Sequence, residues 1–228
     1  MDEVEQQRAY YRETAAAYDQ MHVANDDEHA TAIAHMLPYL HALGVESILD
    51  TGCGTGRGIK LIQRLSPGIR VHGNDPSREL LDASGLPGDV VDCCSSERLP
   101  YRDAQFDAVI EIGVLHHVPK PEAVIAEMLR VARKAVFLSD SNIYGQGNHG
   151  WLKYLLRQAH LLSHINRARR GGHEWYSSEG DGIAYSYSVF DSYRQIASAS
   201  RETRAIPIDG SGRTALFSSP HVLLVGIK

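Results

Sequence analysis

Cysteine is scarce in this chain of 228 residues, which contains three. They are Cys53, Cys93 and Cys94, and they include no CxxC pair, which disfavours a zinc site built from cysteines. Neighbours in sequence rarely form a disulfide, and the total is odd. This cysteine usage is typical of a reducing compartment, so we expect the protein in the cytoplasm.

Long apolar runs and an excess of basic charge are also missing. No stretch approaches the roughly 18 apolar residues that span a bilayer, and the N-terminus has no apolar core of a secretory signal. The net charge of −5 argues against a protein that binds the phosphate backbone of nucleic acid. The basic cluster "RARR" at residues 167–170 is interpreted as a solvated helix end. We expect neither DNA nor a membrane as a partner.

Strand-like and helix-like stretches alternate from residue 45 onward, which implies right-handed crossovers and a parallel sheet covered by helices. Two later strand-like runs complete the sheet as an antiparallel pair, so the predicted fold class is α/β with seven strands. Hydrophobic residues make up 43% of the chain, enough for a full core. The predicted strands are 47–52, 70–75, 88–93, 106–114, 134–140, 202–208 and 221–228, and the helices between them include 57–66, 76–84 and 120–133.

The segments before and within this α/β pattern are less regular. Residues 1–44 are predicted to form an N-terminal helical lid, and residues 45–228 the main domain with an insertion at about 142–193. Within the insertion, residues 151–170 read as one amphipathic helix and residues 171–193 as a loop rich in Gly, Ser and Tyr. The apolar side of that helix is predicted from Leu152, Leu155, Leu156, Ala159, Leu162 and Ile165.

A glycine loop follows the first strand in the run "ILDTGCGTG". Gly52, Gly54 and Gly56 recur at every second position. Glycine accepts positive φ and lets a ligand approach the backbone, and a loop between a strand and a helix points free N–H groups at whatever binds. Alone, the motif fits either a nucleotide site or a structural tight turn. The loop lacks the GK[ST] of a P-loop, and isoleucine follows where a nicotinamide site more often has its last glycine.

Two acidic residues sharpen this interpretation. Asp75 ends the second strand and Asp92 ends the third. A carboxylate at the first position can accept hydrogen bonds from two ribose hydroxyls, and one at the second can meet an adenine amino group. Both strand ends meet at the carboxyl edge of the sheet, where open α/β folds bind ligands.

Together these motifs resemble the class I S-adenosylmethionine-dependent methyltransferases. The resemblance covers about residues 45–140 and rests on "ILDTGCGTGRG", "VHGNDPSRELL", "VVDCC", "LPYRDAQFDAVIEIGVLHHV" and "AEMLRVAR". It implies a Rossmann-like fold with an antiparallel final strand, and S-adenosylmethionine as cofactor with S-adenosylhomocysteine as product. The implied cofactor residues are Asp50, Gly52, Cys53, Gly54 and Gly56 on the methionine side, Asp75 on the ribose, Pro76, Asp92 and Cys93 around the adenine, Glu111 beside the cofactor, and Tyr11 and Tyr18 closing over it.

Methyl transfer depends mainly on alignment, and a general base matters where the acceptor loses a proton. The candidates for that base are His116, His117 and Asp140, which follow the fourth strand or end the fifth. For His117 the alternative is a structural hydrogen bond to a loop carbonyl. The ExxEH sequence of some metal-binding relatives is replaced by "GVLHH", so we expect catalysis without a metal ion.

The acceptor is expected to be a small molecule that is methylated on O, N or C. Aromatic residues of the insertion suit the wall of a small pocket, and the predicted substrate contacts are His117, Tyr144, Trp175, Asp181 and Tyr185. Alternatives that remain open are a cofactor-binding regulator without transferase activity, other chemistry on the same sulfonium, and a protein or RNA acceptor. The oligomeric state is open, with a homodimer as one possibility.

Overall fold

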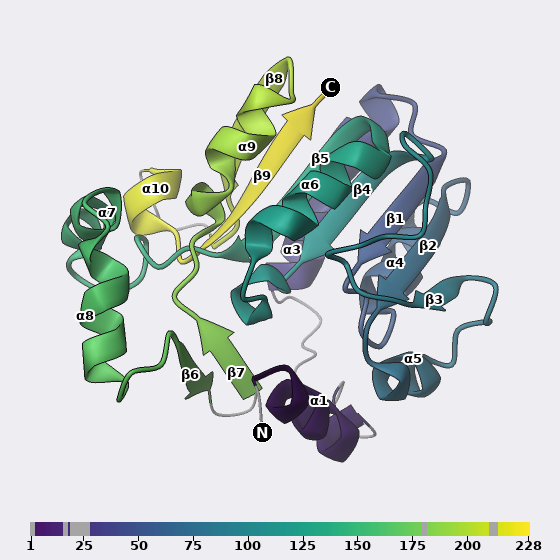
Figure 1. Ribbon diagram of the computed structural model, residues 1–228. Coiled ribbons are helices and arrows are strands. Elements are labelled where there is room, and N and C mark those ends of the chain that lie inside the picture. The colour runs from purple at the N-terminus through teal and green to yellow at the C-terminus, as the bar shows by residue number, and fades with distance from the viewer. Residues whose placement is uncertain (1–2, 16–17, 19–27, 179–181, 210–213) are drawn as a thin grey trace.

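The central feature of the fold is one seven-stranded sheet with the order β3-β2-β1-β4-β5-β9-β8. The computed structural model describes residues 3–15, 18, 28–178, 182–209 and 214–228 (Figure 1). The first five strands run parallel and β9 runs antiparallel between β5 and β8, which confirms the predicted fold class. The strands are β1 (Ser47–Thr51), β2 (Arg70–Asp75), β3 (Val91–Cys93), β4 (Phe106–Ile112), β5 (Ala132–Ser141), β8 (Glu202–Pro207) and β9 (His221–Ile227).

Helices cover both faces of the sheet. One face packs against α3 (Glu28–Ala42), α4 (Arg57–Leu65) and α5 (Arg78–Ser84), and the other against α6 (Pro121–Val131) and α9 (Tyr193–Ser198). Every residue of β4 is buried, as expected for a central strand with helices on both sides. Strand β9 shows the alternation directly, because Leu223 and Val225 join one core cluster while Val222 and Leu224 join the other.

The strand order reverses between β1 and β4. From β1 the chain moves outward to β2 and β3, then returns to place β4 on the other side of β1. Loops that leave the carboxyl ends of β1 and β4 therefore diverge, and an open crevice forms between them. The short helix η2 (Leu115–His117) follows β4 at this point.

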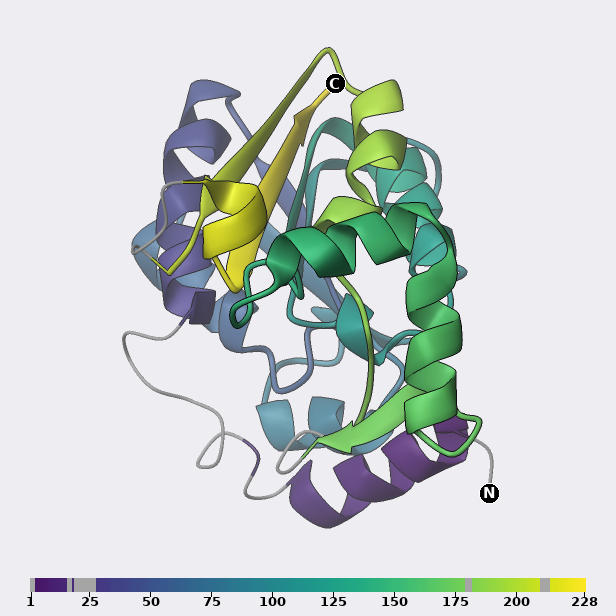
Figure 2. The ribbon, with the colours of Figure 1, turned by 90° about the vertical axis from the view of Figure 1, so that its left-hand side faces the viewer.

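The N-terminal region divides into two parts with different roles. Helix α3 buries Ala32, Ile33, Met36 and Leu40 in the core, so the predicted lid of residues 1–44 is wrong for this helix. Helix α1 (Glu3–Thr14) lies apart from the core, below the carboxyl edge of the sheet and beside β7 (Figures 1 and 2). The apolar stripe of α3 explains the difference, since it must be buried against the sheet.

The insertion contains two helices and a β-hairpin. Helices α7 (Gly150–Gln158) and α8 (Leu161–Arg169) are separated by His160, which adopts a left-handed conformation with φ 57° and turns the chain sharply (Figure 2). Strands β6 (Trp175–Ser178) and β7 (Gly182–Tyr185) pair antiparallel where the sequence predicts a loop. The remaining elements are η3 (Val189–Asp191) and α10 (Ala215–Ser218).

The break at His160 also corrects the predicted single apolar side of residues 151–170. Leu162 is buried, but Leu152 and Leu155 are exposed to solvent. One continuous helix would align these residues, whereas the turn between α7 and α8 directs them differently. No helix in the described part of the chain has the length and apolar character needed to cross a bilayer.

Candidate active site

A cavity of about 910 Å³ lies at the carboxyl edge of the sheet. Its wall includes residues from the ends of β1, β2, β4 and β5, together with residues of α1 and the β6–β7 hairpin. The volume lies near the upper end of the roughly 300–1,000 Å³ of small-molecule sites. Such a cavity has room for two small ligands side by side.

The three glycines of the loop after β1 differ in what occupies the space beside their Cα atoms. All three have positive φ: 72° at Gly52, 52° at Gly54 and 72° at Gly56. A Cβ at Gly52 would lie 2.5 Å from Val114, and one at Gly56 would collide with Leu86. A Cβ at Gly54 would meet only Leu80, at 4.0 Å. Gly54 is therefore the one of the three whose open side belongs to the cavity, while the other two make room for protein side chains.

Asp75 anchors this loop from the neighbouring strand. Its Oδ2 accepts a hydrogen bond of 2.9 Å from the Gly54 N–H, and its Oδ1 accepts one of 2.8 Å from the Ser77 N–H. Burial raises the pKa of Asp75 to about 6, and the two N–H donors offset part of that effect. Each carboxylate oxygen has two lone pairs, so Asp75 can accept further hydrogen bonds from a ligand in the cavity.

Asp50 is a second buried carboxylate in the cavity wall. It lies against the first turn of α4, where a Cβ at Gly58 would come 2.6 Å from its Oδ2. Burial, and then the nearby charge of Asp75, raises the pKa of Asp50 to about 7. Because desolvation opposes a negative charge here, a cationic ligand group beside Asp50 would favour the ionised carboxylate.

Glu111 orders the loop after β4 from below. Its Oε1 accepts hydrogen bonds from the N–H groups of Val114, at 2.5 Å, and Leu115, at 3.2 Å. Glu111 is fully buried but is not part of the cavity wall. Burial, and then the charge of Asp140, raises the pKa of Glu111 well above its ordinary value. In the structure this residue positions the loop, and its predicted contact with a cofactor stays a prediction.

His116 and Asp140 form a hydrogen-bonded pair in the cavity wall. The distance between His116 Nδ1 and Asp140 Oδ1 is 2.7 Å, and Asp140 Oδ2 accepts from the Leu115 N–H at 2.7 Å. Burial alone would raise the pKa of Asp140, but the charge and hydrogen bond of His116 lower it overall. An ionised Asp140 accepts the Nδ1 proton of His116, which leaves the basic lone pair of the neutral ring on Nε2.

His117 lies beside His116, with 4.0 Å between the ring centroids, but has a different partner. The distance between its Nδ1 and the Ile183 carbonyl oxygen is 2.5 Å, which is the structural alternative considered for this residue. The Ile183 N–H donates to Gln7 Oε1 at 2.6 Å. Ile183 of the hairpin thus connects α1 to the loop after β4.

Several predicted site residues line the cavity together. Tyr11 and Tyr18 contribute from the N-terminal segment, with ring centroids 6.0 Å apart in an edge arrangement. The remaining ones are Asp50, Gly52, Cys53, Gly54, Asp75, Pro76, His116, His117, Asp140 and Tyr185.

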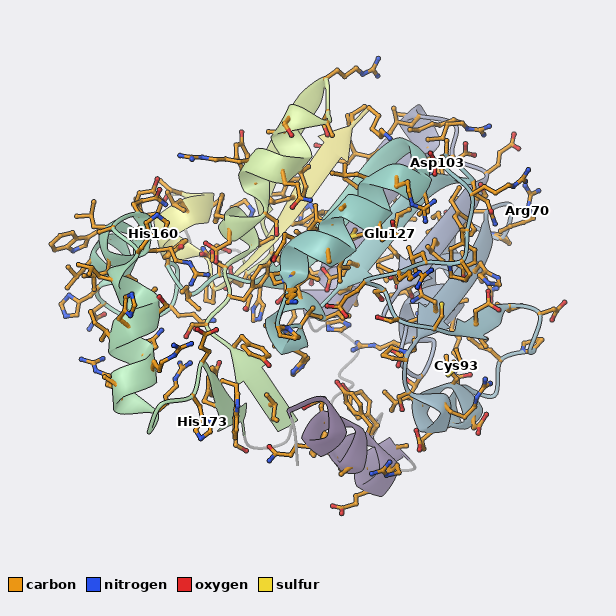
Figure 3. All side chains as sticks on the ribbon, in the orientation of Figure 1. Arg70, Cys93, Asp103, Glu127, His160 and His173 are labelled. Carbon is orange, nitrogen blue, oxygen red and sulfur yellow. The ribbon has the colours of Figure 1, made fainter. Side chains whose placement is uncertain are left out.

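Six other predicted site residues do not line the cavity: Gly56, Asp92, Cys93, Glu111, Tyr144 and Trp175. Asp92 instead accepts hydrogen bonds at its Oδ2, at 2.8 Å from His72 and 2.9 Å from Tyr101. The exposed Cys93 lies on β3 at the outer edge of the sheet (Figure 3).

Tyr144 and Trp175 are kept out of the cavity wall by a buried hydrogen bond and by the alternation of side chains along β6, respectively. Tyr144 is buried and donates its hydroxyl to Asp191 Oδ1 at 2.8 Å, which keeps it out of the cavity wall where a substrate contact was predicted. Successive strand residues point to opposite faces, and in β6 it is Tyr176, not Trp175, that faces the cavity. Asp181 lies outside the described residues.

Further cavity residues were not predicted. They include Gln7, Glu28 and His29 near the N-terminus, and His221 at the start of β9. The predicted strand order could have indicated that His221 reaches the cavity. β9 runs antiparallel to β5, so its first residue lies at the carboxyl edge, where His221 pairs with Ser141. In the described part of the chain, no group of three or more His, Cys, Asp or Glu side chains is arranged to hold a metal ion.

Comparison with known sequences identifies a related family for residues 49–139, the region that runs from β1 to β5. Residues 49–139 match the family described as "Methyltransferase domain". The chain is 35% identical over 89 residues to the probable tRNA methyltransferase 9B of Bos taurus, covering 39% of this chain and 19% of that protein. It is 33% identical over 94 residues to the ubiquinone/menaquinone biosynthesis C-methyltransferase of Desulfotalea psychrophila, covering 40% and 38%.

These sequence matches are partial, because the chain spans less than two-fifths of the length of either relative. The fold match is wider. The magnesium protoporphyrin IX methyltransferase of Synechocystis, solved with bound S-adenosylhomocysteine, superposes with a TM-score of 0.60 at 18% identity and 97% coverage of both chains. Residues 49–139 thus match a methyltransferase domain, and the chain has the fold seen in class I, S-adenosylmethionine-dependent methyltransferases.

Proposed function

We propose that the protein transfers a methyl group from S-adenosylmethionine to a small molecule bound in the same cavity. One observation carries this proposal. A single cavity contains an open glycine backbone at Gly54, two buried carboxylates at Asp50 and Asp75, and the His116–Asp140 pair. The first three suit a cofactor with a sugar and an amino acid, and the last suits a reacting acceptor.

The residues present fit the cofactor. Gly54 offers a backbone with no side chain between it and the cavity. Asp75 retains lone pairs that would accept hydrogen bonds from the two ribose hydroxyls, and the Asp50 carboxylate in the cavity wall would pair with the cationic amino group of the methionine moiety. Tyr11, Tyr18 and Pro76 provide apolar surface around these groups. When bound, S-adenosylmethionine supplies a methyl group on a positively charged sulfur.

The His116–Asp140 pair supplies the base for an acceptor that must lose a proton. Asp140 holds the Nδ1 proton, so His116 receives the acceptor's proton at Nε2 and becomes an imidazolium stabilised by the buried carboxylate. Glu111, Leu115 and Asp140 fix the loop that presents His116. Alignment of the two ligands in one cavity supplies the larger share of the acceleration, roughly 7–11 kcal/mol in well-oriented systems.

The cavity favours a small acceptor over a macromolecule. Helix α1 and the β6–β7 hairpin lie beside each other and both contribute to its wall, and Gln7 joins them through Ile183. The net charge of −5 does not suit an RNA partner. The names of relatives such as the tRNA methyltransferase 9B of Bos taurus favour an RNA acceptor as the second candidate. The family match ends at residue 139, before the insertion that contributes to the acceptor side.

The test follows labelled methyl from S-adenosylmethionine into a metabolite extract and, separately, into total tRNA. We expect label in the small-molecule fraction, dependent on the protein and unaffected by EDTA. Label confined to tRNA would replace the small-molecule proposal with the second candidate. Binding of S-adenosylhomocysteine without label in either pool would indicate a regulator without transferase activity.

A further inference from the structure

Helices α7 and α8 expose a set of large apolar side chains that we call the α7–α8 face. It consists of Trp151, Leu152, Leu155 and Leu161, which are 56%, 41%, 53% and 50% exposed. Trp151 and Leu155 are four residues apart in α7 with Leu152 between them, so the three share one side of the helix. Large exposed apolar side chains on one side of a helix, here joined by Leu161 at the start of α8, mark a surface that contacts something apolar.

The charge of the same segment differs sharply from that of the chain. Residues 149–173 contain five Lys and Arg residues, four His residues and no Asp or Glu, while the whole chain has a net charge of −5. Exposed polar residues on this segment include His160, His164 and Arg169. His160 lies at the outer edge of the molecule, where α7 meets α8 (Figure 3). Asp191 and Glu174, outside this range, pair with Arg157 and Arg167, so five cations less two carboxylates leave a local excess of three positive charges, which is complementary to an anionic surface.

The arrangement of the cations separates a lipid surface from a nucleic acid. Arg157 is paired with Asp191, and Arg167 with Glu174. Lys153 donates to the carbonyls of Ile143 and Gln146 at 3.0 and 2.8 Å. A protein that reads phosphates presents its cations outward. Here Lys153, Arg157 and Arg167 are held within the insertion, Arg169 is exposed, and the large side chains presented outward are tryptophan and leucine, which suit the boundary of a lipid surface and not a phosphate backbone.

We propose that the α7–α8 face docks reversibly on anionic membrane surfaces. Amphipathic helices that lie in the interface bury Trp and Leu at the boundary between headgroups and acyl chains, with cations around them facing anionic lipid. The face adjoins the cavity in sequence at both ends, since Ile143 and Gln146 precede α7, Tyr176 follows α8, and all three line the cavity. Docking is independent of methyl transfer and does not require the function proposed above.

Flotation of the full chain with defined vesicles tests the proposal. Vesicles of phosphatidylcholine with 30% phosphatidylserine should carry the wild-type protein at 0.1 M salt, and pure phosphatidylcholine should carry at least about fivefold less. The doubly substituted Trp151→Ser, Leu155→Ser protein should lose at least tenfold in vesicle binding. Leu65→Ser is the matched control, because Leu65 is 47% exposed on α4, and it should float like the wild type.

Several results would overturn the proposal. They are no flotation of the wild type, equal flotation on neutral vesicles, or equal flotation of the doubly substituted protein. A stable dimer in light scattering that the double substitution disperses would instead assign the face to a second copy. Tighter binding to tRNA than to anionic vesicles would assign it to RNA. Binding of S-adenosylhomocysteine by each variant, measured separately, reports folding and the cofactor site.

Discussion

His116 Nδ1 and Asp140 Oδ1 lie 2.7 Å apart, although the residues are 24 positions apart in sequence and come from different strand ends. Asp140 is also held by the N–H groups of Leu115 and Ser141. The carboxylate is therefore fixed before any ligand binds, and it fixes the imidazole in turn. Of the two adjacent histidines, His116 is better suited to accept a proton, because its carboxylate partner stabilises the imidazolium that forms. The partner of His117 is a neutral backbone carbonyl.

Replacing His116 by glutamine should therefore affect turnover and not cofactor binding. We expect the rate of methyl transfer to fall by about 10²–10⁴, with the Kd for S-adenosylhomocysteine within about threefold of wild type. His117→Gln is the comparison, and a smaller effect on turnover is expected from it. Rates are measured by transfer of labelled methyl into the acceptor pool. Wild-type turnover in His116→Gln would exclude it as the base.

Gly54→Ala should weaken the binding of S-adenosylhomocysteine while preserving the fold. The added methyl group points into the cavity, where only Leu80 lies near, so no protein atom needs to move. The positive φ costs about 1–2 kcal/mol of stability. Gly44→Ala is the matched control, because Gly44 has φ 58° and nothing within 4 Å of its Cβ position. Both variants should melt at similar temperatures, and calorimetry should show weakened binding of S-adenosylhomocysteine in Gly54→Ala alone. Equal affinity in the two variants would show that Gly54 does not face the ligand.

Asp50→Asn should stabilise the ligand-free protein near neutral pH. The pKa of Asp50 is raised from 3.8 to about 7, so the folded protein holds a proton that the unfolded chain has released. Stability is therefore lost as the pH rises from about 4 to about 7, with an upper bound of about 4 kcal/mol at about 1.4 kcal/mol per pKa unit. The melting temperature of Asp50→Asn should exceed that of wild type at pH 8, and the gap should narrow at pH 5.

The exposed substitution Asp82→Asn serves as the control and should show no such pH-dependent gap. Asp50→Asn should also bind S-adenosylhomocysteine more weakly, because the ligand's ammonium group loses its carboxylate partner. A variant less stable than wild type at pH 8 would mean that the Asp50 carboxylate supports the fold.

Asp92→Asn distinguishes the sequence interpretation of this residue from its place in the structure. The carboxylate binds His72 and Tyr101 and does not line the cavity. We expect the Kd for S-adenosylhomocysteine to change less than threefold, with a modest loss of thermal stability. A tenfold weaker Kd at an unchanged melting temperature would support the adenine contact instead.

The sheet was predictable because short strand-like runs alternate regularly with helix-like stretches, and β4 is buried at every residue. The cofactor side was predictable for a related reason. Gly54 and Asp75 directly follow or end strands, so the topology alone brings them to one edge. The different tasks of Gly52 and Gly54 were not predictable, because Val114 lies far away in sequence and meets Gly52 only in the folded chain.

The acceptor side could be predicted only in part. The β6–β7 hairpin has Gly and Ser among its aromatic residues, which hides its strand pattern, and it packs beside α1 rather than in the main sheet. Glu28 and His29 reach the cavity from the start of α3, a core helix that the sequence predicts as part of a lid. No local pattern marks such residues, since their proximity depends on contacts between distant segments.

Calorimetric titration of S-adenosylhomocysteine into wild-type protein and Asp75→Asn tests the cofactor site most directly. We expect a micromolar Kd for wild type and a loss of at least about tenfold in the variant, the size expected for a hydrogen bond to a charged group. Both proteins must show cooperative melting. No binding to folded wild-type protein, or equal affinity in folded Asp75→Asn, would contradict the assignment of this cavity to an adenosyl cofactor.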